Sequence, residues 1–234
     1  MVATLIAVMA LPPIAQDPAY HDFADSRAFF GVPAFLNVVT NLAFLIVGIV
    51  GVRACATGAV AGARWAWLTC FGAVALVGVG SSYYHLAPDD NTLVWDRLPM
   101  SAGFMALLVA VLAEHLQPRL EKILLAPAIL VGIASIVVWH ATGDLRLYVW
   151  VQFMPLLVIP AVLLLFDNPY THGRLLLVAL AVYALAKLAE HYDGVVFEAT
   201  GKIISGHSLK HLLAALALFV VYRMLQRRTT RNRN

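Results

Sequence analysis

Three short stretches of the chain carry side chains that could bind a metal ion and move protons. Ser81 and His85 are four residues apart, so on a helix they share one face. His207 and His211 have the same spacing at the start of the last apolar segment, and Asp96 lies in the connection that follows His85. A catalytic zinc ion is held by three protein ligands plus a water, and neutral imidazole is one of its usual ligands. The sequence therefore predicts that the three histidines bind one zinc ion.

The serine and the aspartate suggest what such a zinc ion would do. Zinc lowers the pKa of a bound water from about 15.7 to near 7 and polarises a carbonyl group. Asp96 would then act as general base and later as proton donor, and Ser81 would donate a hydrogen bond to an oxyanion. We do not expect Ser81 to be a covalent nucleophile, because three metal-bound histidines leave none to serve as its base. Two histidines four apart could also bind haem iron, or simply pack among polar groups.

The composition indicates which environment holds these residues. Of 234 residues, 62% are hydrophobic and 12% are charged, whereas a soluble domain has about 25% charged residues. Continuous apolar runs of roughly 20 residues are typical of membrane-spanning helices, and they do not alternate as barrel strands do. The sequence predicts an all-α polytopic membrane protein with a seven-helix bundle. The formal net charge of +3 does not indicate nucleic-acid binding, because the basic residues stand in short loops and in the tail.

The chain divides into four parts by composition. Residues 1–15 form a short hydrophobic segment, signal-like or helical, and 16–36 a mixed polar loop outside the membrane. Residues 37–224 form the bundle, and 225–234 a basic tail. The expected spans are 37–56, 65–86, 98–114, 121–140, 147–166, 174–191 and 204–224.

Lysine and arginine set the expected orientation. Most basic residues fall in alternate loops and the tail: Arg53, Arg64, Arg119, Lys122, Arg174, Arg223, Arg227, Arg228, Arg231 and Arg233. Basic loops stay in the cytoplasm, so we expect a cytoplasmic C-terminus. His85, Asp96 and His207 then share one depth, near the non-cytoplasmic face.

The motifs resemble those of the alkaline ceramidase family. The similarity lies in Gly78 to His85, in the W-D-R-L-P-M run from Trp95, in Gly206 to His211 and in the N-V-V-T-N run from Asn37. That family belongs to a group of seven-helix hydrolases and receptors that includes the progestin and adiponectin receptors. The resemblance implies hydrolysis of the N-acyl amide of ceramide, with His85, His207 and His211 as zinc ligands and with Ser81 and Asp96 catalytic.

One feature departs from the family pattern. Eukaryotic alkaline ceramidases bind calcium with an acidic loop before the first helix, completed by a glutamate at the position that Ala34 occupies here. Asp22 and Asp25 remain in that loop. A calcium site at these two residues and a simple solvated loop are both open alternatives.

Other functions and substrates stay open on the sequence alone. A lipid receptor with a structural zinc site is the main alternative, and a transporter or haem protein the third. The substrate could be a ceramide, a phytoceramide or another acylated amino-lipid, and nothing indicates the oligomeric state. We expect Asn37 and Asn41 to form interhelical hydrogen bonds, Lys187 to pair with Glu190, and Lys210 to point away from the histidines toward a carboxylate.

Overall fold

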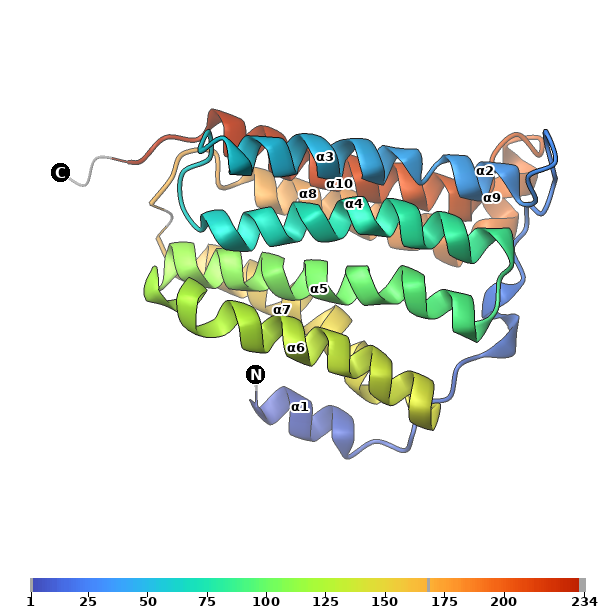
Figure 1. Ribbon diagram of the computed structural model, residues 1–234, viewed down its shortest axis with the longest axis horizontal. Helices are drawn as coiled ribbons and strands as arrows, with labels where there is room; N and C mark the ends of the chain where they lie inside the picture. Colours follow the sequence, from blue (N-terminus) through green and yellow to red (C-terminus); the bar gives the residue numbers. More distant parts are fainter. Residues whose placement is uncertain (1, 168, 232–234) are drawn as a thin grey trace.

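The computed structural model describes residues 2–167 and 169–231, and helices dominate it (Figure 1). The described residues form no named strand. In chain order the helices are α1 (Val2–Met9), the 3-10 turn η1 (Pro18–His21), α2 (Phe35–Val39), α3 (Leu42–Ala56), α4 (Arg64–Leu86), α5 (Asp90–His115), α6 (Arg119–Thr142), α7 (Arg146–Leu165), α8 (Leu175–His191), α9 (Asp193–Ala199) and α10 (Gly206–Arg227).

The helix lengths confirm an all-α polytopic membrane protein. Six helices are long and apolar enough to cross a bilayer, with α2 and α3 together forming the first. The pair α8 and α9, bent by 85° at its break, makes a seventh when it is counted as one span. Large apolar side chains cover the outward faces, where lipid would contact them: Ile46, Ile49, Leu76, Leu130, Leu157, Leu164 and Leu216.

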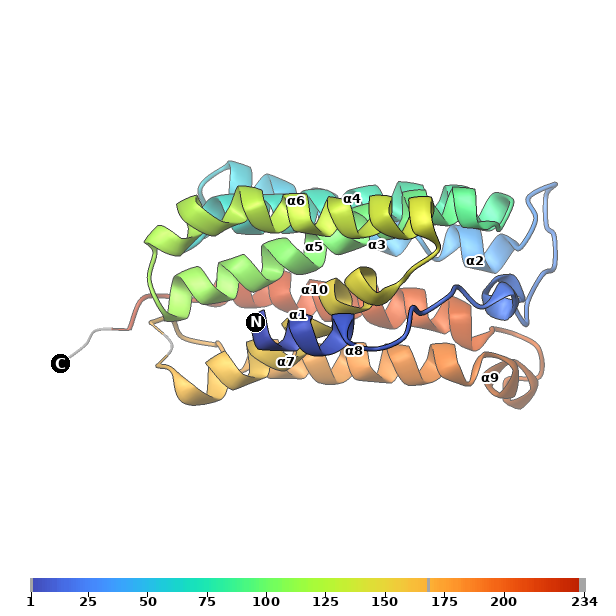
Figure 2. The same cartoon turned by 90° about the horizontal axis from the view of Figure 1, so that it is seen from below.

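The spans form an elongated bundle two layers deep. Figures 1 and 2 show α3, α4, α5 and α6 following one another across one layer, with α10, α8 and α7 behind them. Helix α5 packs against α4, α6 and α7, while α10 packs against α8 and α3. Helices α4 and α5 are the most deeply buried of the six single spans.

Helix α5 begins well before the expected start at residue 98, so the prediction that Asp96 precedes this helix was wrong. Asp89 caps the helix, since its carboxylate accepts a hydrogen bond from the Thr92 backbone N–H at 2.6 Å. The Thr92 hydroxyl accepts the Asp89 backbone N–H at 3.0 Å, which completes a capping box. Asp96 consequently lies on the second turn of a formed helix, 6% exposed.

The N-terminal segment is a short helix that lies against α7 (Figure 2). Arg146, at the start of α7, donates hydrogen bonds to the backbone oxygens of Met9 and Leu11 at 2.8 and 2.7 Å. The indole N–H of Trp150 donates to the Thr4 hydroxyl at 3.0 Å. These contacts attach α1 to the outside of the bundle.

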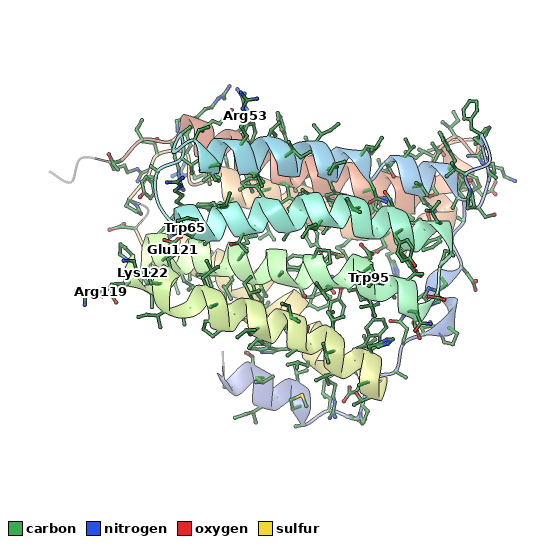
Figure 3. The ribbon with its side chains drawn as sticks, in the orientation of Figure 1. Arg53, Trp65, Trp95, Arg119, Glu121 and Lys122 are labelled. Atoms are coloured by element: carbon green, nitrogen blue, oxygen red, sulfur yellow. The ribbon has the colours of Figure 1, made fainter. Side chains whose placement is uncertain are left out.

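The basic loops gather at one end of the bundle. In Figure 3, Arg53, Arg119 and Lys122 lie in the half from which the C-terminus leaves, and Trp95 lies in the other half. Helix α10 extends to Arg227, and Arg228 is only 7% exposed. The first residues of the expected tail therefore belong to the folded bundle, and Arg233 lies outside the described residues.

Candidate active site

Three imidazoles meet at the end of the bundle opposite the basic loops. His85 comes from the last turn of α4, and His207 and His211 come from the first two turns of α10. The Nε2 atoms of His85 and His207 are 3.2 Å apart. One nitrogen from each ring lies within 4.8 Å of the others, and all three side chains are buried. The structure therefore brings together the three histidines that the sequence singled out.

The nitrogen geometry fits a metal ion. Ligands at about 2.0–2.1 Å in a tetrahedron are separated by roughly 3.3 Å, close to the His85–His207 spacing. His211 Nε2 is buried without a hydrogen-bond partner. An orphaned buried acceptor is costly, so these rings form a suitable cradle for a divalent cation.

Thr40 fixes the ring of His211. The Thr40 hydroxyl donates to the Leu36 backbone oxygen at 2.7 Å, so its single proton is used there. Its 2.9 Å contact with His211 Nδ1 must then have the imidazole N–H as donor. This tautomer leaves a lone pair on Nε2, as metal binding requires.

Asp193, the first residue of α9, and Phe23, in segment 16–36, lie against the histidines. The Asp193 carboxylate accepts the His207 backbone N–H at 2.7 Å and the Ala24 backbone N–H at 2.9 Å. Ala24 is next to Phe23, whose ring lies 4.3 Å from that of His207 and 4.8 Å from that of His85, centroid to centroid. Segment 16–36 therefore covers the histidines with an aromatic ring.

Ser81 and Asp96 lie at a close contact between α4 and α5. A Cβ at Gly80 would lie 2.0 Å from the Trp95 backbone oxygen, so only glycine permits this spacing. Both side chains are buried, and the Ser81 hydroxyl lies near the Asp96 carboxylate. Both also line the cavity that His211 lines.

A lysine–glutamate–lysine group stands beside the histidines. Lys187 pairs with Glu190, as expected, and Lys210 Nζ lies 3.0 Å from Glu190 Oε1. Lys210 Nζ is also 3.2 Å from His207 Nε2. The expectation that Lys210 points away from the histidines was therefore wrong, because its side chain bends back to reach this group.

The cavity that connects these groups has a volume of about 410 Å³, within the roughly 300–1,000 Å³ of small-molecule sites. Polar side chains occupy one part of it. The remainder is apolar and extends along α10 to Val221, ten residues and about 15 Å beyond His211. Apolar walls also come from the other helices: Leu107, Leu156, Ile159 and Leu180.

The calcium alternative gains no support. Asp25 is buried, but both of its carboxylate oxygens accept hydrogen bonds from Arg27 at 2.8 Å, and this guanidinium lowers the pKa of Asp25. Asp22 is exposed. Within residues 2–167 and 169–231, the histidine trio is the single group of three or more metal-binding side chains.

Of the two asparagines expected to form interhelical hydrogen bonds, only Asn37 does so. The Ser208 hydroxyl donates to Asn37 Oδ1 at 2.6 Å and so joins α10 to α2. Asn41 instead donates within its own helical segment, to the Asn37 backbone oxygen at 2.8 Å. The prediction is confirmed for Asn37.

Comparison with known families agrees with this geometry. The family model described as Ceramidase matches residues 31–234. The chain belongs to the ceramidase family. No curated protein matches the chain closely enough to count as a relative. Membership of this family indicates a membrane hydrolase that acts on the amide bond of a ceramide-like lipid, and the histidine trio gives it a place where a metal ion could bind.

Proposed function

We propose that this ceramidase-family protein is a zinc-dependent amidase that hydrolyses the N-acyl amide of ceramide or a closely related lipid. The observation that carries the proposal is a cluster of three buried imidazoles, one of which, His211, lines the same cavity as Ser81 and Asp96. His85, His207 and His211 would hold the zinc ion, each through one ring nitrogen. Zinc supplies Lewis acidity, which polarises a carbonyl and makes water nucleophilic at neutral pH.

Asp96 would move the proton in this reaction. Its carboxylate lines the cavity that His211 also lines. It would accept a proton from the attacking water and return it to the amide nitrogen, so that the amine can leave. Ser81 would hold the carboxylate in place, or donate its hydrogen bond to the carbonyl oxygen as negative charge develops there.

The cavity suits a lipid with one long chain at the reacting group. Its apolar part takes an acyl chain out of water, and burial of each CH₂ contributes about 0.8 kcal/mol. The polar part holds the amide near the end of the bundle. We place this end at the non-cytoplasmic face, because the opposite end carries the basic loops.

The decisive experiment measures zinc and turnover together. Purified wild-type protein should contain about one zinc per chain and release fatty acid from a panel of N-acyl lipids, and a chelator should abolish this release. Asp96→Asn should keep the zinc and lose at least about 100-fold in turnover, the scale of general acid–base catalysis. His211→Ala should lose both. A zinc-loaded protein that cleaves none of the lipids would instead favour the receptor with a structural zinc site.

A further inference from the structure

The cavity holds a buried guanidinium that the proposed reaction does not use. Arg97 follows Asp96 on α5, lines the same cavity and is 4% exposed. Its guanidinium carbon lies 5.0 Å from the ring centre of Tyr20, 4.4 Å from that of Trp139 and 4.8 Å from that of Tyr148. These rings come from η1, α6 and α7, so three elements surround one side chain.

The rings stabilise the positive charge but leave its N–H groups without acceptors. Cation–π contacts act through the ring face, whereas guanidinium N–H groups need oxygen acceptors in the plane of the fork. Nε and Nη1 of Arg97 are buried and have no hydrogen-bond partner. A buried cation without an acceptor is expensive, so the site is incomplete as it stands.

Arg228 at the other end of the bundle shows what completes such a site. It is 7% exposed and also lies over aromatic rings, at 5.7 Å from Trp67 and 4.4 Å from Tyr170. There the Glu114 carboxylate accepts from both Nη1 and Nη2 at 2.7 Å. Arg97 has similar surroundings but no such carboxylate ion pair in the described part of the chain.

The other cations of the cavity cannot substitute for this role. Lys187 and Lys210 share Glu190, so their charges already have a carboxylate. We propose that Arg97 is a specificity-determining residue that binds an oxyanion carried by the lipid in the cavity. A carboxylate matches the guanidinium fork with two parallel hydrogen bonds. This inference rests on the proposed function and adds an acidic group to its substrate or product.

Such an oxyanion has two chemical sources. Hydrolysis of the amide releases a fatty acid, whose carboxylate could move from the histidines to Arg97. Alternatively, the intact substrate carries an acidic headgroup. Both sources present the same chemistry to the guanidinium, and the experiment has one arm for each.

The first arm measures equilibrium binding of palmitate and of hexadecanol to detergent-solubilised protein by calorimetry. The ratio of the two affinities within one variant cancels any loss of folded protein. Arg97→Gln should lower this ratio at least about tenfold. Arg97→Lys keeps the charge but loses the guanidinium fork, so it should lower the ratio by a smaller factor. If the glutamine variant does not fold, a ratio in Arg97→Lys below that of the wild type is the test. The matched control Arg53→Gln, at an exposed arginine that does not line the cavity, should leave the ratio unchanged.

The second arm compares turnover of N-palmitoylethanolamine, which is neutral, and N-palmitoylglycine, which is acidic. If the headgroup is the source, Arg97→Gln raises KM at least about tenfold for the acidic lipid alone and leaves palmitate binding unchanged. Unaltered ratios in both arms would overturn the inference. Loss of palmitate selectivity in His211→Ala but not in Arg97→Gln would rule out the fatty acid as the source, because its carboxylate then sits at the histidines. Together with an unaltered KM ratio in the second arm, that result would overturn the inference. A wild-type protein that binds palmitate through Arg97 but cleaves no amide would refute only the proposed reaction.

Discussion

Thr40 is the residue whose chemistry is most sharply defined by its neighbours. Because its hydroxyl proton goes to the Leu36 backbone oxygen, its oxygen must accept the His211 Nδ1 proton. A partner of this kind orients a metal ligand and selects its tautomer. Thr40 would therefore act on a bound metal ion through His211, as a positioning residue.

We predict that Thr40→Val weakens zinc binding by about 10–100-fold, the usual effect of removing a ligand's hydrogen-bond partner. The valine keeps the shape of threonine but cannot accept the imidazole proton. Competition with a chromophoric chelator measures the affinity. Thr57→Val is the matched control, since Thr57 bonds only to backbone oxygens at the far end of α3. Equal zinc affinities in the two variants would contradict the role given to Thr40.

Sequence reasoning found the three histidines because their signal is local. Spacing by four residues places His207 and His211 on one face of any helix, and topology brought His85 to the same depth. Thr40, Phe23 and Asp193 were not found as parts of the site. Thr40 stands inside the N-V-V-T-N motif, so it gave a signal, but its partner is 171 residues away. Such pairings depend on how α2 and α10 pack, which the sequence pattern does not encode.

At the scale of elements, the contact between α4 and α5 sets the distance between Ser81 and Asp96. This contact depends on Gly80, whose missing side chain lets the Trp95 backbone oxygen approach. The histidines lie on α4 and α10, so they do not depend on the position of α5. A change at Gly80 should therefore separate catalysis from metal binding.

We predict that Gly80→Ala lowers stability by about 1–3 kcal/mol through overpacking and reduces turnover at least tenfold, while zinc content stays near one per chain. Thermal unfolding, lipid turnover and metal analysis test the three parts. Gly72→Ala is the matched control on the same helix, because a Cβ there has nothing within 4 Å. Wild-type turnover in Gly80→Ala would show that this close contact does not position Asp96.

The docking of α1 rests on Asp144, between α6 and α7, and on Arg146 at the start of α7. Arg146 donates to two backbone oxygens of the N-terminal segment, and Asp144 accepts the Ile14 backbone N–H at 3.3 Å. We predict that Arg146→Gln makes residues 1–15 sensitive to chymotrypsin at neutral pH, because those oxygens lose their donor. Arg53→Gln, at the other end, should leave the segment protected. Equal protection in both variants would show that apolar packing alone holds α1.

The contacts of Asp144 and Arg146 with the N-terminal segment should weaken in acid. Hydrogen bonds from Arg146 lower the pKa of Asp144 from 3.8 to about 2. A depressed carboxyl pKa stabilises the fold fully above its unfolded value and ceases to do so as the pH falls through its folded value. We predict that α1 stays docked from pH 8 to pH 5 and loosens between about pH 4 and 2. The fluorescence of Trp150, taken as the difference from Trp150→Phe, reports this, and Asp144→Asn should abolish the pH dependence.

At the scale of the whole molecule, the bundle has two chemically different ends. One end holds the histidines, Asp96 and Arg97 beneath segment 16–36, and the other holds the basic loops. The sequence predicted this polarity and the helix order, because apolar runs and loop charges are read directly along the chain. It did not predict the cavity or the rings around Arg97, since these arise from residues of separate helices.

The difference between the two ends predicts how the protein is oriented in the membrane. Basic loops remain cytoplasmic, so the active site should open toward the non-cytoplasmic face. Ala87 follows α4 at the histidine end, Ala59 lies in the loop between α3 and α4 at the basic end, and both are exposed. Cys55 and Cys70 are 0% and 1% exposed, so they should contribute little background to thiol labelling.

We predict that a membrane-impermeant maleimide labels Ala87→Cys in intact cells but labels Ala59→Cys only after permeabilisation. Labelling of both variants in permeabilised cells serves as the control for reactivity. The reverse pattern would place the histidines at the cytoplasmic face, and the lipid would then have to come from the inner leaflet. Because the three histidines lie at one end of the bundle, the labelled side also decides which leaflet supplies the substrate.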